Sequence, residues 1–247
     1  MATSKTFNKP LIGTIISIGA SQVAEMISIA GFDWVLIDME HSTLSLDSVQ
    51  IALQVLDDKI IKIVRVPGND EIWIKRVLDT GCDGILVPMI NTADEAKKVV
   101  KSSKYPVDGQ RSVGLARAHK FGAGFKEYLA AANKDLLIMI QIEHIEGVKN
   151  IDSILKVKDI DSVFIGPYDL SASMGLTGQI FHPDVVSAIN HIKDKCRQAG
   201  LPYGIFGMNP EPMVSELNDG CTFLLCGVDT SNLLNSYTDM IRILKKG

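Results

Sequence analysis

Short apolar segments rich in Ile, Val and Leu alternate along the chain with longer segments of helical period, and the alternation repeats about eight times. Strands that are apolar at nearly every position are typical of a parallel sheet with both faces covered. The repetition therefore predicts an α/β fold, and it fits a closed (β/α)₈ TIM barrel better than an open doubly wound sheet. The expected strands cover residues 11–18, 34–38, 60–66, 84–88, 136–143, 162–166, 202–206 and 222–226.

The segments between these strands predict amphipathic helices, among them residues 70–80, 92–101, 146–157, 183–199 and 211–219. A different pattern covers residues 102–124, which combine Pro106 and four glycines with Arg111, Arg117 and His119. Long irregular segments in compact domains are commonly functional. We therefore expect this segment to be a lid over the active site.

The length of 247 residues and the 46% hydrophobic content predict one large core, and hence a single domain over residues 1–247. The formal charge of −4, with Lys and Arg spread along the chain, disfavours nucleic acid and membrane surfaces as partners. The chain lacks an apolar leader, a run of about 18 apolar residues, a C-x-x-C pair and an Asn-x-Ser/Thr site. We expect a cytoplasmic protein.

A nucleotide-binding fold is the main alternative for an alternating pattern. The dinucleotide motif G-x-G-x-x-G follows none of the expected strands. Gly122 and Gly124 begin such a motif, but Glu127 stands where its third glycine should be. The Walker sequence is also absent from the chain. Nucleotide binding is therefore not expected.

Polar side chains stand where several of the expected strands end, which is where the active sites of such barrels lie. They occur at residues 38–41 after the second strand, at Arg65 in the third, at Gln141 and Glu143 in the fifth, and at residues 166–169 after the sixth. Strand alternation places Gln141 and Glu143 on one face. We expect these groups to meet at one mouth of the barrel.

Two carboxylates in this set predict a metal site. A single carboxylate after a strand is often only a helix cap. Glu143 and Asp169, however, come from successive strand ends and could hold Mg²⁺ or Mn²⁺ while leaving positions open for substrate and water. Neither a cysteine nor a spaced histidine pair stands beside them in the sequence, which argues against a zinc site.

Four sequence blocks resemble the HpcH/HpaI aldolases, which are pyruvate-dependent class II aldolases of the phosphoenolpyruvate/pyruvate barrel superfamily. The blocks are I-D-M-E-H at 37–41, R-V at 65–66, Q-I-E at 141–143 and F-I-G-P-Y-D-L-S-A-S-M-G at 164–175. They occur together and in order, and the resemblance runs from about residue 10 to the C-terminus.

The resemblance implies that Glu143 and Asp169 bind a divalent metal, with Mg²⁺ and Mn²⁺ as the first candidates and Co²⁺ as a further one. It implies that Arg65 neutralises the oxygen of a pyruvate enolate. Pyruvate would also be held by Gln141 and by the backbone from Gly166 to Tyr168, beside Asp169. The substrates would be pyruvate and an aldehyde, or the 4-hydroxy-2-oxo acid that they form.

The resemblance further assigns His41 as the acid/base residue. Asp79, fourteen residues after Arg65, would raise the basicity of His41, and Phe206 would line the acceptor side of the pocket. A neutral imidazole suits removal of the C4 hydroxyl proton during cleavage. The family also implies a homohexamer, a trimer of dimers that exchange C-terminal helices.

Departures from the family pattern leave acceptor specificity open. Tyr168 is bulkier than the alanine of several members, and Ser112 replaces a frequent glycine. Four alternatives remain: a thioester lyase similar to the citrate lyase β subunit, another enolate enzyme of the phosphoenolpyruvate/pyruvate barrel superfamily, a metal-free Schiff-base aldolase and a noncatalytic binding barrel. Lys62, the candidate for a Schiff base, has the opposite strand parity to Arg65 and should point toward the helices.

Overall fold

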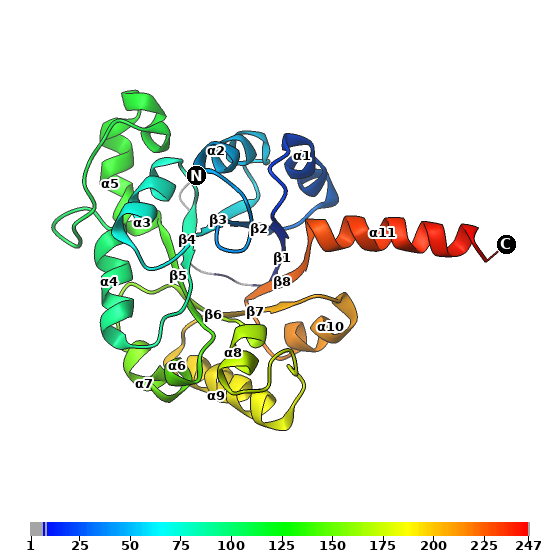
Figure 1. Cartoon of the computed structure of the whole chain (residues 1–247). Helices are drawn as coiled ribbons and strands as arrows, with labels where there is room; N and C mark the ends of the chain where they lie inside the picture. Colours follow the sequence, from blue (N-terminus) through cyan, green and yellow to red (C-terminus); the bar gives the residue numbers. More distant parts are fainter. Residues whose placement is uncertain (1–6, 8, 247) are drawn as a thin grey trace.

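Eight parallel strands close into a barrel in which each strand pairs with its neighbours in chain order. The computed structural model, which describes residue 7 and residues 9–246, is shown in Figure 1. This arrangement confirms the expected (β/α)₈ fold, and the ends of the strands differ from the expected ones by only one or two residues. The strands are β1 (Leu11–Ile16), β2 (Trp34–Asp38), β3 (Ile61–Arg65), β4 (Gly84–Val87), β5 (Leu137–Ile142), β6 (Ser162–Ile165), β7 (Tyr203–Gly207) and β8 (Phe223–Val228).

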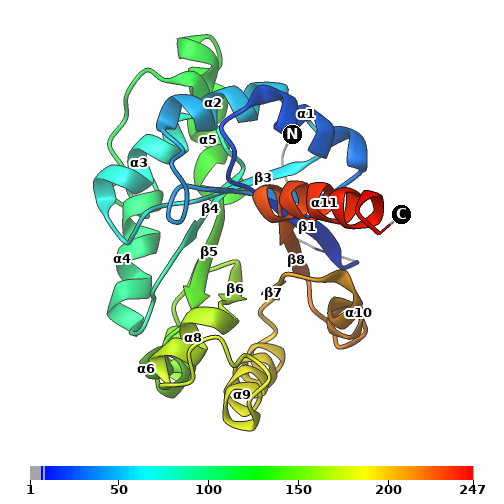
Figure 2. The ribbon, with the colours of Figure 1, turned by 45° about the vertical axis from the view of Figure 1, so that its right-hand side comes forward.

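Helices surround the outside of the barrel, as two views show (Figures 1 and 2). The expected helix at 146–157 is divided into two short helices at Asn150, whose side-chain amide donates to the Asn91 carbonyl at 2.8 Å. The helices are α1 (Ser21–Ala30), α2 (Leu46–Val55), α3 (Glu71–Asp79), α4 (Ala93–Ser103), η1 (Arg117–Gly122), α5 (Phe125–Asp135), α6 (Ile145–Lys149), α7 (Ile151–Ile154), α8 (Pro167–Ser173), α9 (Pro183–Ala199), α10 (Pro210–Asn218) and α11 (Asp229–Leu244).

Several helix boundaries follow from local capping. The Asp70 carboxylate accepts from the first backbone N–H groups of α3, and Thr92 with Glu95 forms a capping box at the start of α4. Gly200 ends α9 in the left-handed conformation, with a φ of 66° that favours glycine. These residues are polar or conformationally special in the sequence, which explains why the ends of α3 and α9 lie close to the expected positions.

The hydrophobic core has two layers because successive strand residues point to opposite faces. One layer joins the outer faces of the strands to the helices, and the other fills the barrel interior. Trp34 lies fully buried in the interior, where its indole N–H is shared between the carbonyls of Leu11 and Leu224. Its ring packs edge-on against Phe164 and Phe223. The interior is thus filled at the amino end of β2, and the strand carboxyl ends remain for a site.

The prediction that residues 102–124 form a lid over the active site is wrong. Residues 102–124 are tied to the C-terminal end of α3, which lies at the amino ends of the strands. Arg111 is buried and donates to Asp79 at 2.7 Å, and Arg117 donates to the Thr80 carbonyl at 2.7 Å. A buried arginine needs its carboxylate partner, and this pairing holds the segment at the end of the barrel opposite the expected site.

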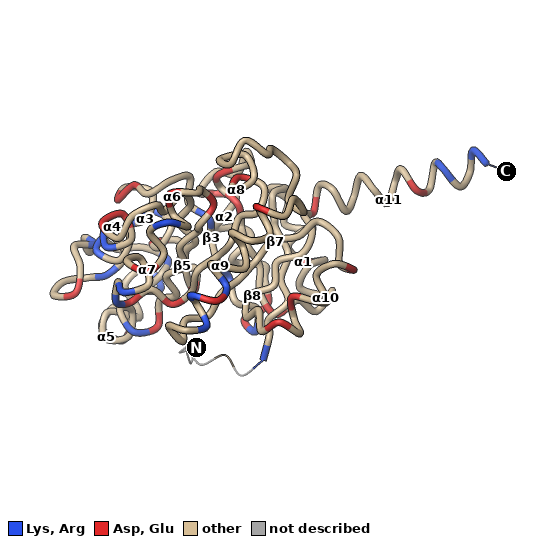
Figure 3. The backbone as a smooth tube through the Cα atoms, turned by 90° about the horizontal axis from the view of Figure 1, so that it is seen from below, with Lys and Arg blue, Asp and Glu red and all other residues tan. Residues whose placement is uncertain are grey.

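Helix α11 extends away from the barrel, and none of its residues is buried (Figures 1 and 3). Its side chains include exposed Leu234, Tyr237, Ile241 and Leu244. Within residue 7 and residues 9–246, none of the helices combines the length and apolar character that crossing a membrane requires.

We predict that Gly13→Ala destabilises the barrel. A Cβ atom at Gly13 would lie 2.5 Å from the Trp34 ring, which is enclosed on all sides. Overpacking of this kind costs about 1–3 kcal/mol, which would be measured as a lower denaturant midpoint. Gly68→Ala is the control, because nothing lies within 4 Å of a Cβ there. Equal midpoints for the two variants would contradict this account of the interior.

Candidate active site

A cavity of about 460 Å³ opens at the carboxyl ends of the strands. Most residues that the sequence assigned to the site line it, although they come from distant parts of the chain. These are His41, Arg65, Gln141, Gly166, Tyr168, Asp169 and Phe206. The cavity therefore gathers the predicted groups into one place, as the strand ends suggested.

Arg65 is held on the cavity wall by two carboxylates. Its Nε and Nη2 donate to the two Asp38 carboxylate oxygens at 2.8 Å each, and Nη1 lies 3.2 Å from Glu40 Oε2. Burial acts against ionisation of both Asp38 and Arg65, but their mutual hydrogen bonds and charges outweigh it. The pKa of Asp38 is therefore lowered and that of Arg65 is raised. The result is a guanidinium fixed in charge and position.

The sequence shows Asp38 and Glu40 as polar residues at the end of a strand but predicts no role for them. Asp38 and Arg65 are direct neighbours in the register of β2 and β3, which brings their side chains together. The register of two strands is not readable from either strand alone. The only sign of this pair in the sequence is that an acidic residue, Asp38, and a basic residue, Arg65, stand at the ends of consecutive strands.

Glu143 and Gln141 form a buried pair at the end of β5. Glu143 Oε2 accepts from Gln141 Nε2 at 2.5 Å, and Oε1 accepts from the Met89 backbone N–H at 2.8 Å. A Cβ atom at Gly166 would lie 2.7 Å from Glu143 Oε2 and 2.8 Å from Gln141 Nε2. Glycine at 166 therefore lets the backbone between β6 and α8 approach these two polar groups closely.

Negative charge accumulates around Glu143. Burial raises the pKa of Glu143 to about 7, and the charges of Glu40 and Asp169 act in the same direction. The Met89 N–H and the charge of Arg65 oppose this shift but do not cancel it. Buried carboxylates that resist ionisation together are stabilised by a cation, so the charge distribution favours one here.

The donor set fits a hard divalent cation. Glu143 and Asp169 offer only oxygen atoms, and Gln141 Oε1 is buried without a hydrogen-bond partner. Among the described residues, no group of three His, Cys, Asp or Glu side chains is placed to hold a metal. The oxygen donors gathered here are the carboxylates of Glu143 and Asp169 and the amide oxygen of Gln141.

His41 stands on the rim of the cavity, with 62% of its side chain exposed. The turn that carries it is fixed by Asp38, whose Oδ1 accepts from the backbone N–H groups of Glu40 and His41. The nearest carboxylate is Glu40, with Oε2 3.7 Å from His41 Nε2.

The expected partnership between Asp79 and His41 is wrong for the single chain, because Asp79 pairs with Arg111 instead. Asp79 is the last residue of α3 and pairs with Arg111 at 2.7 Å. Because α3 runs back from the carboxyl end of β3, fourteen residues after Arg65 the chain has reached the opposite end of the barrel. Glu40, and not Asp79, is the carboxylate beside His41.

The remaining wall of the cavity is apolar. The rings of Tyr168 and Phe206 pack with their centroids 6.1 Å apart, and Met208 and Val228 lie on the same cavity. Lysine is absent from the described residues that line the cavity, and Lys62 Nζ donates to the Ile60 carbonyl at 2.9 Å. A Schiff-base aldolase would need a lysine in the cavity, so this alternative has no support.

Comparisons with known sequences and with solved structures point to the same protein family. A 4-hydroxy-2-oxo-heptane-1,7-dioate aldolase from Shigella sonnei is 40% identical over 91% of this chain and 87% of its own length. A hydroxypyruvate/pyruvate aldolase from Roseobacter denitrificans is 38% identical over 96% of this chain and 93% of its own. A solved HpcH/HpaI aldolase/citrate lyase family protein from Burkholderia cenocepacia superposes with a TM-score of 0.91, at 32% identity, over 96% of this chain and 95% of its own. The family model of the HpcH/HpaI aldolases and citrate lyases matches residues 16–236. These matches, together with the geometry of the cavity, show that the chain belongs to the HpcH/HpaI aldolase/citrate lyase family.

Proposed function

We propose that the protein is a divalent-metal-dependent pyruvate aldolase that forms and cleaves 4-hydroxy-2-oxo acids. The observation that carries the proposal is the convergence of a fixed guanidinium, Arg65, with Gln141 and Asp169 on the wall of one cavity. Buried Glu143 lies behind this wall and accepts a hydrogen bond from Gln141. The Shigella and Roseobacter relatives are both named as aldolases, which supports the same reaction class.

During cleavage the bond between C3 and C4 breaks, its electron pair passes to the pyruvate fragment as an enolate, and the C4 hydroxyl loses its proton as the aldehyde forms. Negative charge develops on the C2 oxygen of the enolate. Arg65, whose charge and position are set by Asp38, is suited to stabilise that oxygen. A divalent cation held by Glu143 and Asp169 would supply Lewis-acid stabilisation of the same oxygen.

His41 is proposed to take the proton from the C4 hydroxyl. Its ring lies on the cavity rim and in contact with solvent, so the proton can be passed on to water. The Glu40 carboxylate near Nε2 favours the protonated imidazole that forms. Gln141 and the backbone at Gly166 would hold pyruvate beside the metal.

A thioester lyase similar to the citrate lyase β subunit is less well supported. Coenzyme A carries phosphate groups that need free cations. Among the described residues that line the active-site cavity, the fixed cation is Arg65, and two carboxylates already pair with it. A noncatalytic binding barrel would have no need for this arrangement of charged side chains beside a buried Glu143.

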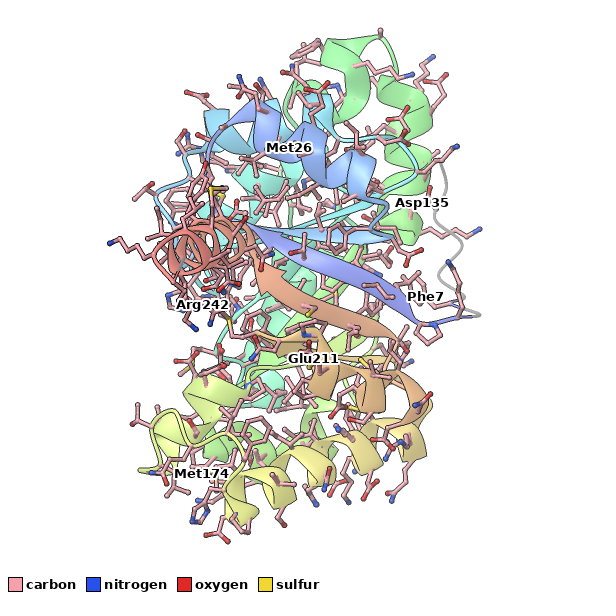
Figure 4. All side chains as sticks on the ribbon, turned by 90° about the vertical axis from the view of Figure 1, so that its right-hand side faces the viewer. Phe7, Met26, Asp135, Met174, Glu211 and Arg242 are labelled. Atoms are coloured by element: carbon pink, nitrogen blue, oxygen red, sulfur yellow. The ribbon has the colours of Figure 1, made fainter. Side chains whose placement is uncertain are left out.

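We also propose that α11 packs against a second copy of the chain. No charged residue occurs between Asp229 and Asp239, and most of α11 is uncharged in Figure 3. A groove of about 350 Å³ beside the base of α11 is lined by apolar residues of α1, including Val23 and Met26. Figure 4 views α11 along its axis, with Met26 of α1 on one side and Glu211 of α10 on the other.

The exposed apolar residues of α11 support exchange of this helix between two subunits. A hexamer built as a trimer of dimers remains a prediction, as do the cytoplasmic location and a single domain over residues 1–247. The choice among Mg²⁺, Mn²⁺ and Co²⁺ also remains a prediction.

Removal of the divalent metal should abolish activity. With excess EDTA, aldol addition of pyruvate should fall to background and recover with Mg²⁺ or Mn²⁺. Glu143→Ala and Asp169→Ala should each lower kcat/KM by about 10²–10³, while Asp94→Ala, at an exposed position of α4, should not. Full turnover in EDTA, or a pyruvate adduct trapped on lysine by borohydride, would show that the mechanism is wrong.

His41→Ala should abolish most cleavage of 4-hydroxy-2-oxo acids, because the C4 hydroxyl proton loses its acceptor. Metal affinity should hardly change, and exchange of the pyruvate methyl protons should continue. His182→Ala is the matched control, because His182 caps α9 at a distance from the site. That control should lose about 0.5–2 kcal/mol of stability and keep its activity. Near-parental cleavage by His41→Ala would remove His41 from the mechanism.

Substitution of Leu234 and Ile241 together by Glu should separate the subunits. Both side chains are exposed on α11 in a single chain, so burial against a second copy is what the charges would oppose. Light scattering after size-exclusion chromatography should show a lower mass than for the parent. An unchanged mass, or a monomeric parent, would contradict the exchange of α11.

A further inference from the structure

A second chamber adjoins the active-site cavity. It has a volume of about 360 Å³ and lies between the loop after α8, helix α9 and helix α10. Its walls are largely apolar and include Ile180, Val186, Ile189 and Pro212. No step of the proposed mechanism uses these residues.

The two spaces meet at an aromatic pair. Tyr168 and Phe206, together with Met208, line both the active-site cavity and the second chamber. Tyr168 is 38% exposed and its ring is tilted by 51° to that of Phe206. A substrate whose reacting carbonyl lies near Arg65 and whose chain passes this pair would therefore continue into the second chamber.

The charges in the second chamber disfavour an anionic occupant. Lys193 is the cation on its wall, and it is buried. Its ammonium group lies 2.7 Å and 2.5 Å from the two oxygens of Glu216, and 3.5 Å from Asp219 Oδ2. One ammonium group already faces two carboxylates, so a third carboxylate would be buried without a free partner.

The active-site cavity likewise offers no free cation to a second carboxylate. Arg65 is paired with Asp38 and Glu40, and the pyruvate carboxyl and enolate oxygens have first use of that charge. The residues beyond it are Tyr168, Phe206 and Met208, which offer apolar and aromatic surface. The Shigella relative is named as the aldolase of a dioate, which has a carboxylate at its far end.

We propose that the acceptor aldehyde of this chain is uncharged and carries an apolar chain that occupies the second chamber behind Tyr168 and Phe206. The inference rests on the proposed aldolase function and names its substrate class. In the addition direction, a bond forms between C3 of the pyruvate enolate and the aldehyde carbon. The aldehyde oxygen takes up a proton, and the apolar chain does not react.

The experiment compares three aldehydes with pyruvate and the parent enzyme: acetaldehyde, hexanal and 6-oxohexanoate. Hexanal and 6-oxohexanoate have the same number of carbons, but the second ends in a carboxylate. We expect kcat/KM for hexanal to exceed both other values by about tenfold or more, because apolar burial favours the chain and the carboxylate finds no partner. Equal or higher kcat/KM for 6-oxohexanoate would overturn the inference.

A matched pair of variants tests whether the preference for hexanal arises in the second chamber. Val186→Trp places a large ring in the second chamber, whereas Ser187→Trp places the same ring on the exposed side of α9. We expect Val186→Trp to lower kcat/KM for hexanal about tenfold and to leave acetaldehyde unchanged, with no effect of Ser187→Trp on either. If Val186→Trp leaves the hexanal value unchanged, the chain does not occupy the chamber.

Exchange of the pyruvate methyl protons with deuterium oxide tests enolate formation separately from acceptor choice, because exchange needs no aldehyde. Parent enzyme that exchanges these protons but shows no preference for hexanal would refute the acceptor class and leave the proposed function standing. Parent enzyme that shows neither exchange nor addition with any aldehyde would refute the proposed function, and the inference with it.

Discussion

The buried ion pair between Arg65 and Asp38 is the interaction on which the active site depends. It neutralises a guanidinium that would otherwise be too costly to bury, and removal of one partner from such a pair typically costs about 3–5 kcal/mol. The same Asp38 carboxylate accepts from the backbone of Glu40 and His41. A single side chain thus fixes the position of the charge for the enolate and the turn that carries the proposed base.

The charges around this pair explain why the site calls for a cation. Burial raises the pKa of Glu143, and the charges of Glu40 and Asp169 raise it further. Arg65 is already shared between Asp38 and Glu40, so it does not balance Glu143 as well. A bound divalent ion would remove this imbalance and at the same time stabilise the enolate oxygen. The excess of negative charge around Glu143 would thus bind the ion, and the bound ion would stabilise the enolate.

The residues that stabilise the barrel interior and those of the proposed active site lie at opposite ends of the strands. Trp34 and its aromatic neighbours fill the interior near the amino ends of the strands, and Arg111 pairs with Asp79 at the same end of the barrel. The carboxyl ends carry the polar groups, divided into a charged wall at Arg65 and Asp169 and an apolar wall at Tyr168 and Phe206. The charged wall suits the 2-oxo acid, and the apolar wall leads to the second chamber.

Much of this protein could be predicted from the sequence. The periodic pattern determined the eight strands, because a strand buried on both faces must be apolar. Strand parity determined that Gln141 and Glu143 share a face, and local capping residues determined where α3 and α9 begin or end. These properties depend on residues that are near one another along the chain.

Only the tertiary structure decided the rest. The pairing of Asp38 with Arg65 depends on the register of two strands, and the separation of Asp79 from His41 depends on the direction of α3. Residues 102–124 read as a lid because their composition is irregular, yet Arg111 binds Asp79 and holds them at the opposite end. Periodicity reports which face a residue occupies, but long-range contacts depend on how whole elements are placed in space.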